Sequence, residues 1–90
     1  MEAARAGVRG LRICGEAARI IRGLTASDVA SATTLLDGAV RAMLITVDFN
    51  LQEMTADSEF TVAVEAESIE LANETKRYTA AVAETLAIGV

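Results

Sequence analysis

The 90-residue chain contains no proline, and its apolar residues recur at steps of three and four. Proline is the residue that most strongly interrupts a helix, and a three- and four-residue period gathers apolar side chains on one side of a helix. Alanine, which has the highest helix propensity, is frequent throughout the chain. We therefore predict an all-α fold in which residues 1–90 form a single helical domain.

Residues with helix-capping chemistry divide the chain into three helices at about residues 2–22, 27–54 and 58–88. Gly23 can end the first helix, and Asp57 or Ser58 can cap the third. One continuous helix through residues 55–58 is an alternative, because that stretch holds neither glycine nor proline. A bend is favoured, since Asp57 would otherwise lie on the heptad seam of a long helix. The expected fold is a three-helix bundle or a helical hairpin, completed by self-association into a larger bundle or a coiled coil.

The apolar pattern of the first and third segments predicts which side of each helix is buried. In the first segment the expected buried residues are Ala6, Gly10, Ile13, Ala17, Ile20 and Leu24, with Leu11, Cys14, Ala18 and Ile21 beside them. Small residues at four-residue steps there would let another helix approach closely. In the third segment the expected face comprises Phe60, Val64, Leu71, Tyr78 and Val82.

The middle segment has two apolar stripes, which predicts that it has neighbours on two sides. One stripe follows a heptad through Val29, Leu36 and Met43 and reaches Asn50, which could fix the register between two copies. The other stripe has no obvious partner within the chain. We therefore predict an interface with a partner helix formed by Leu35, Ala42, Ile45, Phe49 and Asn50.

The charges are unevenly distributed along a chain whose net charge is −5. The first 23 residues are basic, whereas the rest of the chain is acidic. This asymmetry predicts a charged contact face, within one chain or between copies, formed by Arg5, Arg9, Arg12 and Arg19 with Glu67, Glu70 and Glu74. The expected partner is a second copy or another helical protein, and the net acidity argues against nucleic acid.

Missing residue types exclude several kinds of active site. The chain has no histidine, which excludes histidine-based triads and the usual zinc sites, and Cys14 is its single cysteine. We therefore expect no catalytic residues, no metal and no cofactor, and a protein that is not an enzyme. The apolar runs are too short for the ~20 residues of a membrane span, and no signal peptide is visible, which predicts a cytoplasmic protein.

Two stretches resemble the cytoplasmic signalling domain of bacterial chemoreceptors. Residues 2–7, Glu-Ala-Ala-Arg-Ala-Gly, with Gly10 after them, are similar to the hairpin tip of that family, and residues 71–79 are similar to its descending helix. The resemblance implies a non-catalytic interaction module in a signalling assembly, with Glu2 and Arg5 at contacts between receptors and with the kinase and adaptor.

Two other functions fit the pattern. Length, acidity and helical content are similar to those of small helical-hairpin proteins of type VII secretion. Alternatively, the bundle could enclose a small apolar ligand in a cavity lined by Met43, Val47, Phe60 and Tyr78.

Overall fold

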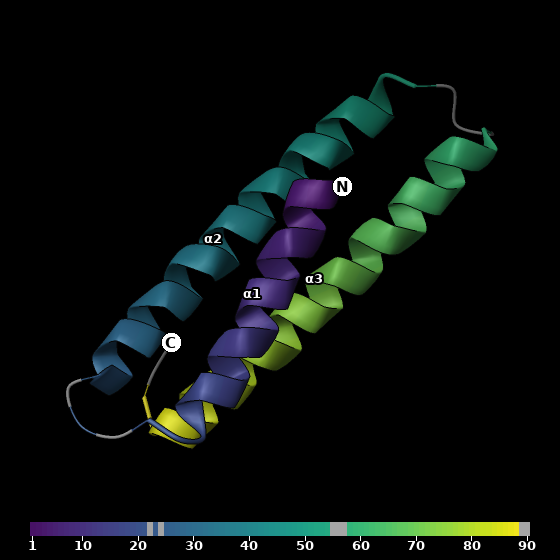
Figure 1. Ribbon diagram of the computed structural model, residues 1–90. Helices are drawn as coiled ribbons and strands as arrows, with labels where there is room; N and C mark the ends of the chain where they lie inside the picture. The colour runs from purple at the N-terminus through teal and green to yellow at the C-terminus, as the bar shows by residue number, and fades with distance from the viewer. Residues whose placement is uncertain (22, 24, 55–57, 89–90) are drawn as a thin grey trace.

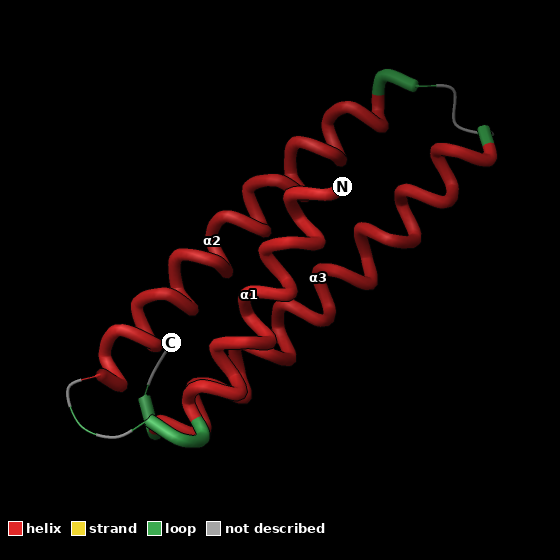
Figure 2. Tube along the Cα trace, in the orientation of Figure 1, coloured by secondary structure: helices red, strands yellow, loops and turns green. Residues whose placement is uncertain are grey.

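A computed structural model describes residues 1–21, 23, 25–54 and 58–88, which form three α-helices. Helix α1 spans Glu2–Ala18, α2 spans Thr25–Gln52 and α3 spans Glu59–Leu86. Helices α2 and α3 run side by side in opposite directions, and the shorter α1 packs along both (Figure 1). The described residues contain no strand, as Figure 2 shows. The predicted all-α class is confirmed.

Capping chemistry accounts for the beginning of α3 but not for the ends of α1. Helix α1 ends at Ala18, four residues before the expected end at residue 22, which lies outside the described residues. Helix α3 begins after Ser58, whose Oγ accepts a hydrogen bond of 3.2 Å from the Thr61 N–H, as expected of an N-cap. Asp57, the alternative cap, is outside the described residues. Because α2 and α3 pack against each other, the alternative of one continuous helix is wrong.

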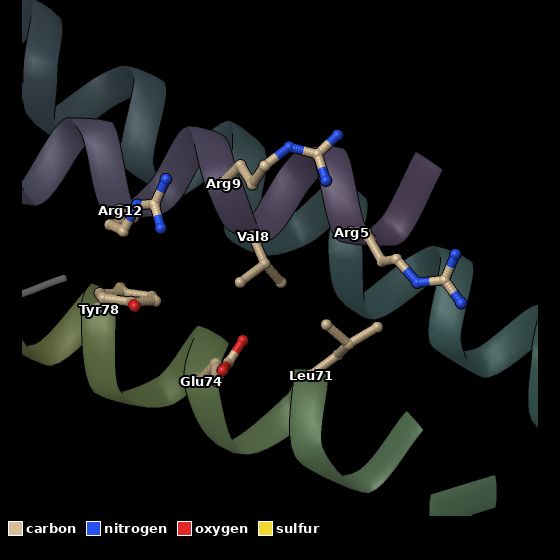
Figure 3. A pocket seen from close by; sticks show the side chains of 7 residues that line it. All are labelled: Arg5, Val8, Arg9, Arg12, Leu71, Glu74 and Tyr78. Atoms are coloured by element: carbon tan, nitrogen blue, oxygen red, sulfur yellow. The ribbon is translucent and has the colours of Figure 1, made fainter. Parts of the chain in front are cut away.

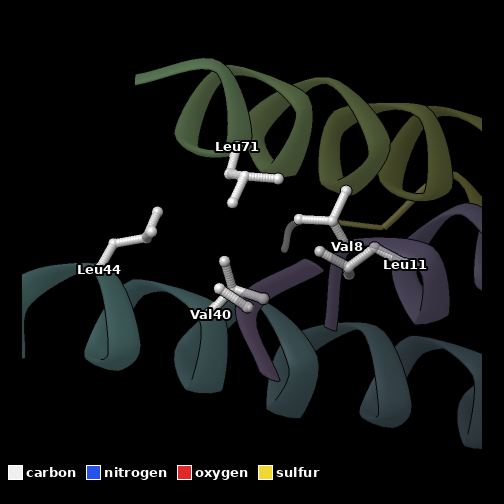
Figure 4. Packing of buried hydrophobic residues seen from close by; sticks show 6 residues of the cluster. Val8, Leu11, Val40, Leu44 and Leu71 are labelled. Atoms are coloured by element: carbon white, nitrogen blue, oxygen red, sulfur yellow. The ribbon is translucent and has the colours of Figure 1, made fainter. Parts of the chain in front are cut away.

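The core joins all three helices. Its larger cluster comprises Ala4, Val8 and Leu11 of α1, Val40 and Leu44 of α2, and Leu71 of α3 (Figure 4). A smaller cluster of Ala18, Val29 and Val82 lies toward the C-terminal end of α1. Burial of these apolar side chains is the main force that holds the three helices together.

Two predictions of the buried faces are wrong. On α1 the expected residues Ala6, Ile13 and Ile20 are exposed, the two isoleucines by 60% and 79%, and Leu24 lies outside the described residues. The helix instead buries the side that carries Val8 and Leu11. The apolar surface of α1 is wider than the area that α2 and α3 cover, so the side that carries Ile13 and Ile20 remains exposed to solvent. Phe60 is 63% exposed because the beginning of α3 extends beyond the N-terminus of α1 (Figure 1).

Gly7 allows a close approach between α1 and α2. A Cβ atom at this position would lie 2.5 Å from Cγ2 of Val40, whose side chain is fully buried. Gly10 lies similarly against Leu36, where a Cβ atom would be 3.0 Å from Cδ1. These two glycines therefore let the side chains of α2 pack directly on the backbone of α1. Of these two, only Gly10 belongs to the row of small residues at four-residue steps that was predicted to let another helix approach, and the closer contact at Gly7 was not predicted.

Helix α2 is long and apolar enough to cross a membrane, judged by length and composition alone. The core helix of a soluble bundle satisfies the same criteria when it is mostly buried, whereas 22% of the most apolar stretch of α2 is buried. In this structure α2 contributes Val29, Thr33, Val40 and Leu44 to the interior, where α1 and α3 cover them. The Thr33 hydroxyl donates to the Val29 carbonyl at 2.8 Å, so this buried polar group has a partner.

Candidate functional site

The strongest candidate site is a surface groove between α1 and α3, which we call the arginine groove (Figure 3). Arg5, Arg9 and Arg12 follow one another at helical spacings of four and three, so they project from one side of α1. All three residues are exposed. Arg9 and Arg12 have no ion-pair partner among the described residues. Their charges are therefore available to a ligand.

Helix α3 forms the opposite wall of the groove. Leu71, Glu74 and Tyr78 follow at steps of three and four, and in Figure 3 the Glu74 and Tyr78 side chains rise toward α1. Val8 and Leu71, both buried, form an apolar floor between the charged walls. The groove has a volume of about 230 Å³. This is slightly below the roughly 300–1,000 Å³ of sites that enclose a whole small molecule, so the groove is suited to part of one.

An ion pair joins the two walls at one end of the groove. The guanidinium of Arg5 donates through Nη2 to Oε1 of Glu67 at 2.6 Å, and through Nε to Oε2 of the same carboxylate. This two-bond geometry is the strongest that an arginine and a carboxylate can form. The hydrogen bonds from Arg5 hold the pKa of Glu67 below its ordinary value of 4.5. They also raise the pKa of Arg5.

The Arg5–Glu67 pair predicts a specific acid sensitivity. Because the pKa of Glu67 is lowered on folding, the pair contributes stability that is complete above pH 4.5 and is lost as the pH falls through the lowered value. Glu67→Gln should therefore lower the thermal midpoint slightly at neutral pH, and the difference from wild type should shrink below pH 4.5. Glu70→Gln, at an exposed carboxylate of the same helix, is the matched control and should show no such difference. Equal pH profiles for the two variants would contradict a role for the pair.

Tyr78 lies at the other end of the groove. The guanidinium carbon of Arg77 is 5.1 Å from the centre of the Tyr78 ring, and Arg77 Nη2 donates to the Tyr78 hydroxyl at 3.5 Å. A cation at this distance is attracted to the ring face. The contact orients the aromatic ring that lines the groove. Tyr78 was expected on an apolar face, and its place among the arginines was not predicted, although its spacing of four from Glu74 indicates a shared side of the helix.

The structure brings together five of the seven residues predicted to form the charged contact face. Arg5 and Glu67 form the ion pair, and Arg9, Arg12 and Glu74 line the groove. Arg19 and Glu70 are exposed and do not line it. The contact between basic and acidic faces thus lies within one chain.

The residues predicted to form the partner interface lie elsewhere. Leu35, Ala42, Ile45, Phe49 and Asn50 are all exposed on α2. Asn50 is therefore on the surface and not on a buried seam of the bundle. The apolar ligand cavity is not found among the described pockets, because none combines Met43, Val47, Phe60 and Tyr78.

Two further features bear on the chemistry of the molecule. Cys14 is half-buried and packs beside the smaller core cluster. Within the described residues, no three His, Cys, Asp or Glu side chains are grouped so that they could hold a metal ion.

The fold and the groove define an all-α three-helix protein with an arginine-lined surface groove. Comparison with protein families identifies the chain more closely, because residues 1–70 match the model of formiminotransferase-cyclodeaminase. This match covers more than half of the sequence, and the chain belongs to the formiminotransferase-cyclodeaminase family. The matched residues include all of α1 and α2 and the part of α3 that contains Glu67. Neither the curated proteins nor the solved structures include a match to the chain.

The family match overturns the functional interpretation of the sequence. The resemblance to chemoreceptor signalling domains is wrong, and so is the function of a signalling interaction module that it implied. The proposed relation to type VII secretion and the apolar-ligand bundle have no support either. Both misleading stretches are short and helical, as many unrelated segments are. Residues 2–7 are also alanine-rich, and residues 71–79 lie outside the matched range.

Proposed function

We propose that this chain takes part in a formiminotransferase-cyclodeaminase reaction by holding an anionic part of the substrate in the arginine groove. The observation that carries the proposal is the position of Arg9 and Arg12, which lack ion-pair partners among the described residues and lie within the stretch that matches the family. The name of the family denotes transfer of a formimino group and ring-closing deamination. The chain would contribute binding to this chemistry.

The composition of the groove supports a ligand that is negatively charged at one end and flat and apolar at the other. The planar guanidinium groups of Arg9 and Arg12 can each donate two parallel hydrogen bonds to a carboxylate or a phosphate. Val8, Leu71 and the Tyr78 ring can cover an apolar portion. Glu74 would repel a second negative charge, which limits the anion to the arginine wall.

We further propose that the chain does not catalyse the reaction on its own. Deamination needs groups that move protons, and histidine, the commonest such group, is absent from the sequence. Among the residues that line the groove, Glu74 is the single carboxylate, and no serine, cysteine or lysine accompanies it. The remaining catalytic groups would come from outside these 90 residues. A cytoplasmic location, which the sequence also predicts, fits this role.

Binding of benzoate, which combines a carboxylate with a flat ring, tests the groove. We expect the double variant Arg9→Gln/Arg12→Gln to weaken binding by about tenfold or more, because each charged hydrogen bond contributes about 1.5–3 kcal/mol. Arg19→Gln is the matched control, since Arg19 is an exposed arginine near the end of the same helix but outside the groove. Chemical shifts of backbone amides measure the affinity and locate the site. Equal affinities for the two variants would refute the assignment.

Ammonia release from a formimino compound tests the second part of the proposal. The purified chain alone should release no more ammonia than the Arg9→Gln/Arg12→Gln variant does. If the wild-type chain alone releases ammonia and the variant does not, the groove is itself an active site and the proposal of a purely binding role fails.

A further inference from the structure

A second surface groove lies between α2 and α3, and no residue of α1 lines it. We call it the acidic groove. On each helix its lining residues follow one another at steps of four and three, so they share one side of that helix. The groove has a volume of about 460 Å³. Its walls include Arg41, Ile45 and Asp48 of α2 and Glu65, Ile69 and Ala72 of α3.

The apolar part of the acidic groove is open to water. Ile45 and Ile69, one from each wall, are 57% and 59% exposed, and Leu44, which also lines the groove, is buried. Apolar side chains on both walls of a groove between two helices are the pattern that receives the apolar side of a third helix. Covering the two isoleucines would remove their surface from water, which is favourable.

Two carboxylates lie in the same groove, one from each wall. Asp48 and Glu65 line it together, and both also line an adjoining pocket of about 240 Å³ with Thr61, so the groove continues toward the beginning of α3. Both acidic residues are exposed, and neither has an ion-pair partner among the described residues. Arg41 does not neutralise them, because its Nε donates to Oδ1 of Asp37 at 2.9 Å. The groove therefore combines apolar walls with two uncompensated negative charges.

Helix α1 shows what kind of helix covers another side of the same α2–α3 hairpin. It buries Val8 and Leu11 against α2 and α3, and its Arg5 pairs with Glu67 of α3. An apolar side and an arginine that meets a carboxylate thus suffice to hold a helix on this hairpin. The acidic groove presents the same combination of exposed apolar side chains and carboxylates, without a helix over it.

We propose that the acidic groove binds a basic amphipathic helix of another protein. The apolar side of that helix covers Ile45 and Ile69, and one of its lysine or arginine side chains lies between Asp48 and Glu65. An anionic lipid surface suits the groove less well, because the two carboxylates would then face charges of the same sign. The proposal does not depend on the arginine groove, which lies between α1 and α3.

A pair of synthetic peptides tests the charge of the partner. The probe consists of two Lys-Leu-Ala-Lys-Leu-Ala-Lys repeats, and its matched control has glutamate in place of every lysine. The wild-type chain should bind the basic peptide about tenfold or more tightly than the acidic one, because only lysine is attracted to the carboxylates. Chemical shifts of backbone amides measure the affinity and should change most near Asp48 and Glu65. Equal affinities for the two peptides would overturn the proposal.

Two double variants test whether the carboxylates of the groove are responsible. Asp48→Asn/Glu65→Gln should weaken binding of the basic peptide by about tenfold or more, since each charged contact is lost. Glu53→Gln/Glu59→Gln is the matched control, because these exposed carboxylates belong to the same hairpin, do not line the groove and change the net charge equally. If both double variants weaken binding to the same extent, the peptide responds to net charge alone and the assignment is refuted.

A single substitution tests the apolar part. Ile69→Ser should weaken binding of the basic peptide about tenfold, because the apolar surface that the peptide covers is lost. Ile13→Ser is the matched control, since Ile13 is an isoleucine of similar exposure, 60%, on α1 and outside the groove. Both residues are on the surface, so both variants should keep the far-ultraviolet circular dichroism spectrum of the wild type. An equal affinity of the two variants would contradict helix docking at this place.

Other occupants of the groove would give different results. Phosphatidylglycerol vesicles that shift the amides near Asp48 and Glu65 would indicate a lipid, and a shift of the same amides on dilution without peptide would indicate a second copy. Either result would overturn the proposal. These measurements are independent of benzoate binding, so the two proposals can fail separately.

Discussion

Replacing Leu11 by alanine should remove a large fraction of the stability of this protein. Leu11 is fully buried and packs in the larger core cluster, where all three helices meet. Truncation of a buried leucine costs about 2–5 kcal/mol, as the sum of lost apolar burial and the cavity left behind. The total free energy of unfolding expected for a chain of this length is only about 5–13 kcal/mol. We therefore expect the variant to be partly unfolded at moderate urea concentrations that leave the wild type intact.

The control for this prediction is Ile13→Ala on the same helix. Ile13 is 60% exposed, so its truncation should change the free energy of unfolding by less than about 0.5 kcal/mol. Urea titrations followed by circular dichroism, at one fixed protein concentration, measure both variants. If Ile13→Ala is the more damaging of the two, α1 buries its other side and the structure of the bundle described above is wrong.

Gly7→Ala should destabilise the bundle, although alanine is the better helix former. The added methyl group would lie 2.5 Å from Cγ2 of Val40, which is fully buried, so one of the two helices would have to shift. Overpacking of this kind costs about 1–3 kcal/mol, whereas the gain in helix propensity is about 1 kcal/mol. The clash should therefore prevail, and α1 should move away from α2 or separate from it.

Gly15→Ala provides a comparison with the opposite expected sign. An added Cβ atom at Gly15 would meet nothing within 4 Å, so the helix-propensity gain of about 1 kcal/mol should appear as increased stability. The two variants make the same chemical change in the same helix and differ only in surroundings. Thermal unfolding of both measures the difference, and an equal stabilisation by the two substitutions would show that α1 does not approach Val40 closely.

The number, type and approximate positions of the helices were predictable from local chemistry. Capping residues such as Ser58 and the lack of proline act within a few residues of their own position, so the sequence displays them directly. The buried side of α1 was not predictable in this way. Its apolar residues extend around more than half of the helix, and the choice of Leu11 over Ile13 for the interior depends on where α2 and α3 lie.

The arginine groove was predictable in part. The charge asymmetry indicated that the arginines of the first segment would meet glutamates of the third, and the Arg5–Glu67 pair has this form. Which arginine meets which glutamate depends on the position of α1 along the axis of α3, and no local sequence pattern encodes that position. The place of Tyr78 in the groove depends on the same axial position. Family membership lay beyond these patterns as well, because helix periodicity is common to many unrelated proteins.

The close contact at Gly7 has a consequence for the groove on the far side of α1. If α1 could slide along its axis by one helical turn, the next arginine of the helix would take the place of Arg5 opposite Glu67. A slide of one turn in either direction would bring Ala3 or Leu11 to the place of Gly7 against Val40, where there is no space for a side chain. Gly7 thus fixes the position of α1 along its own axis. A residue without a side chain therefore determines which arginines a ligand in the groove would contact.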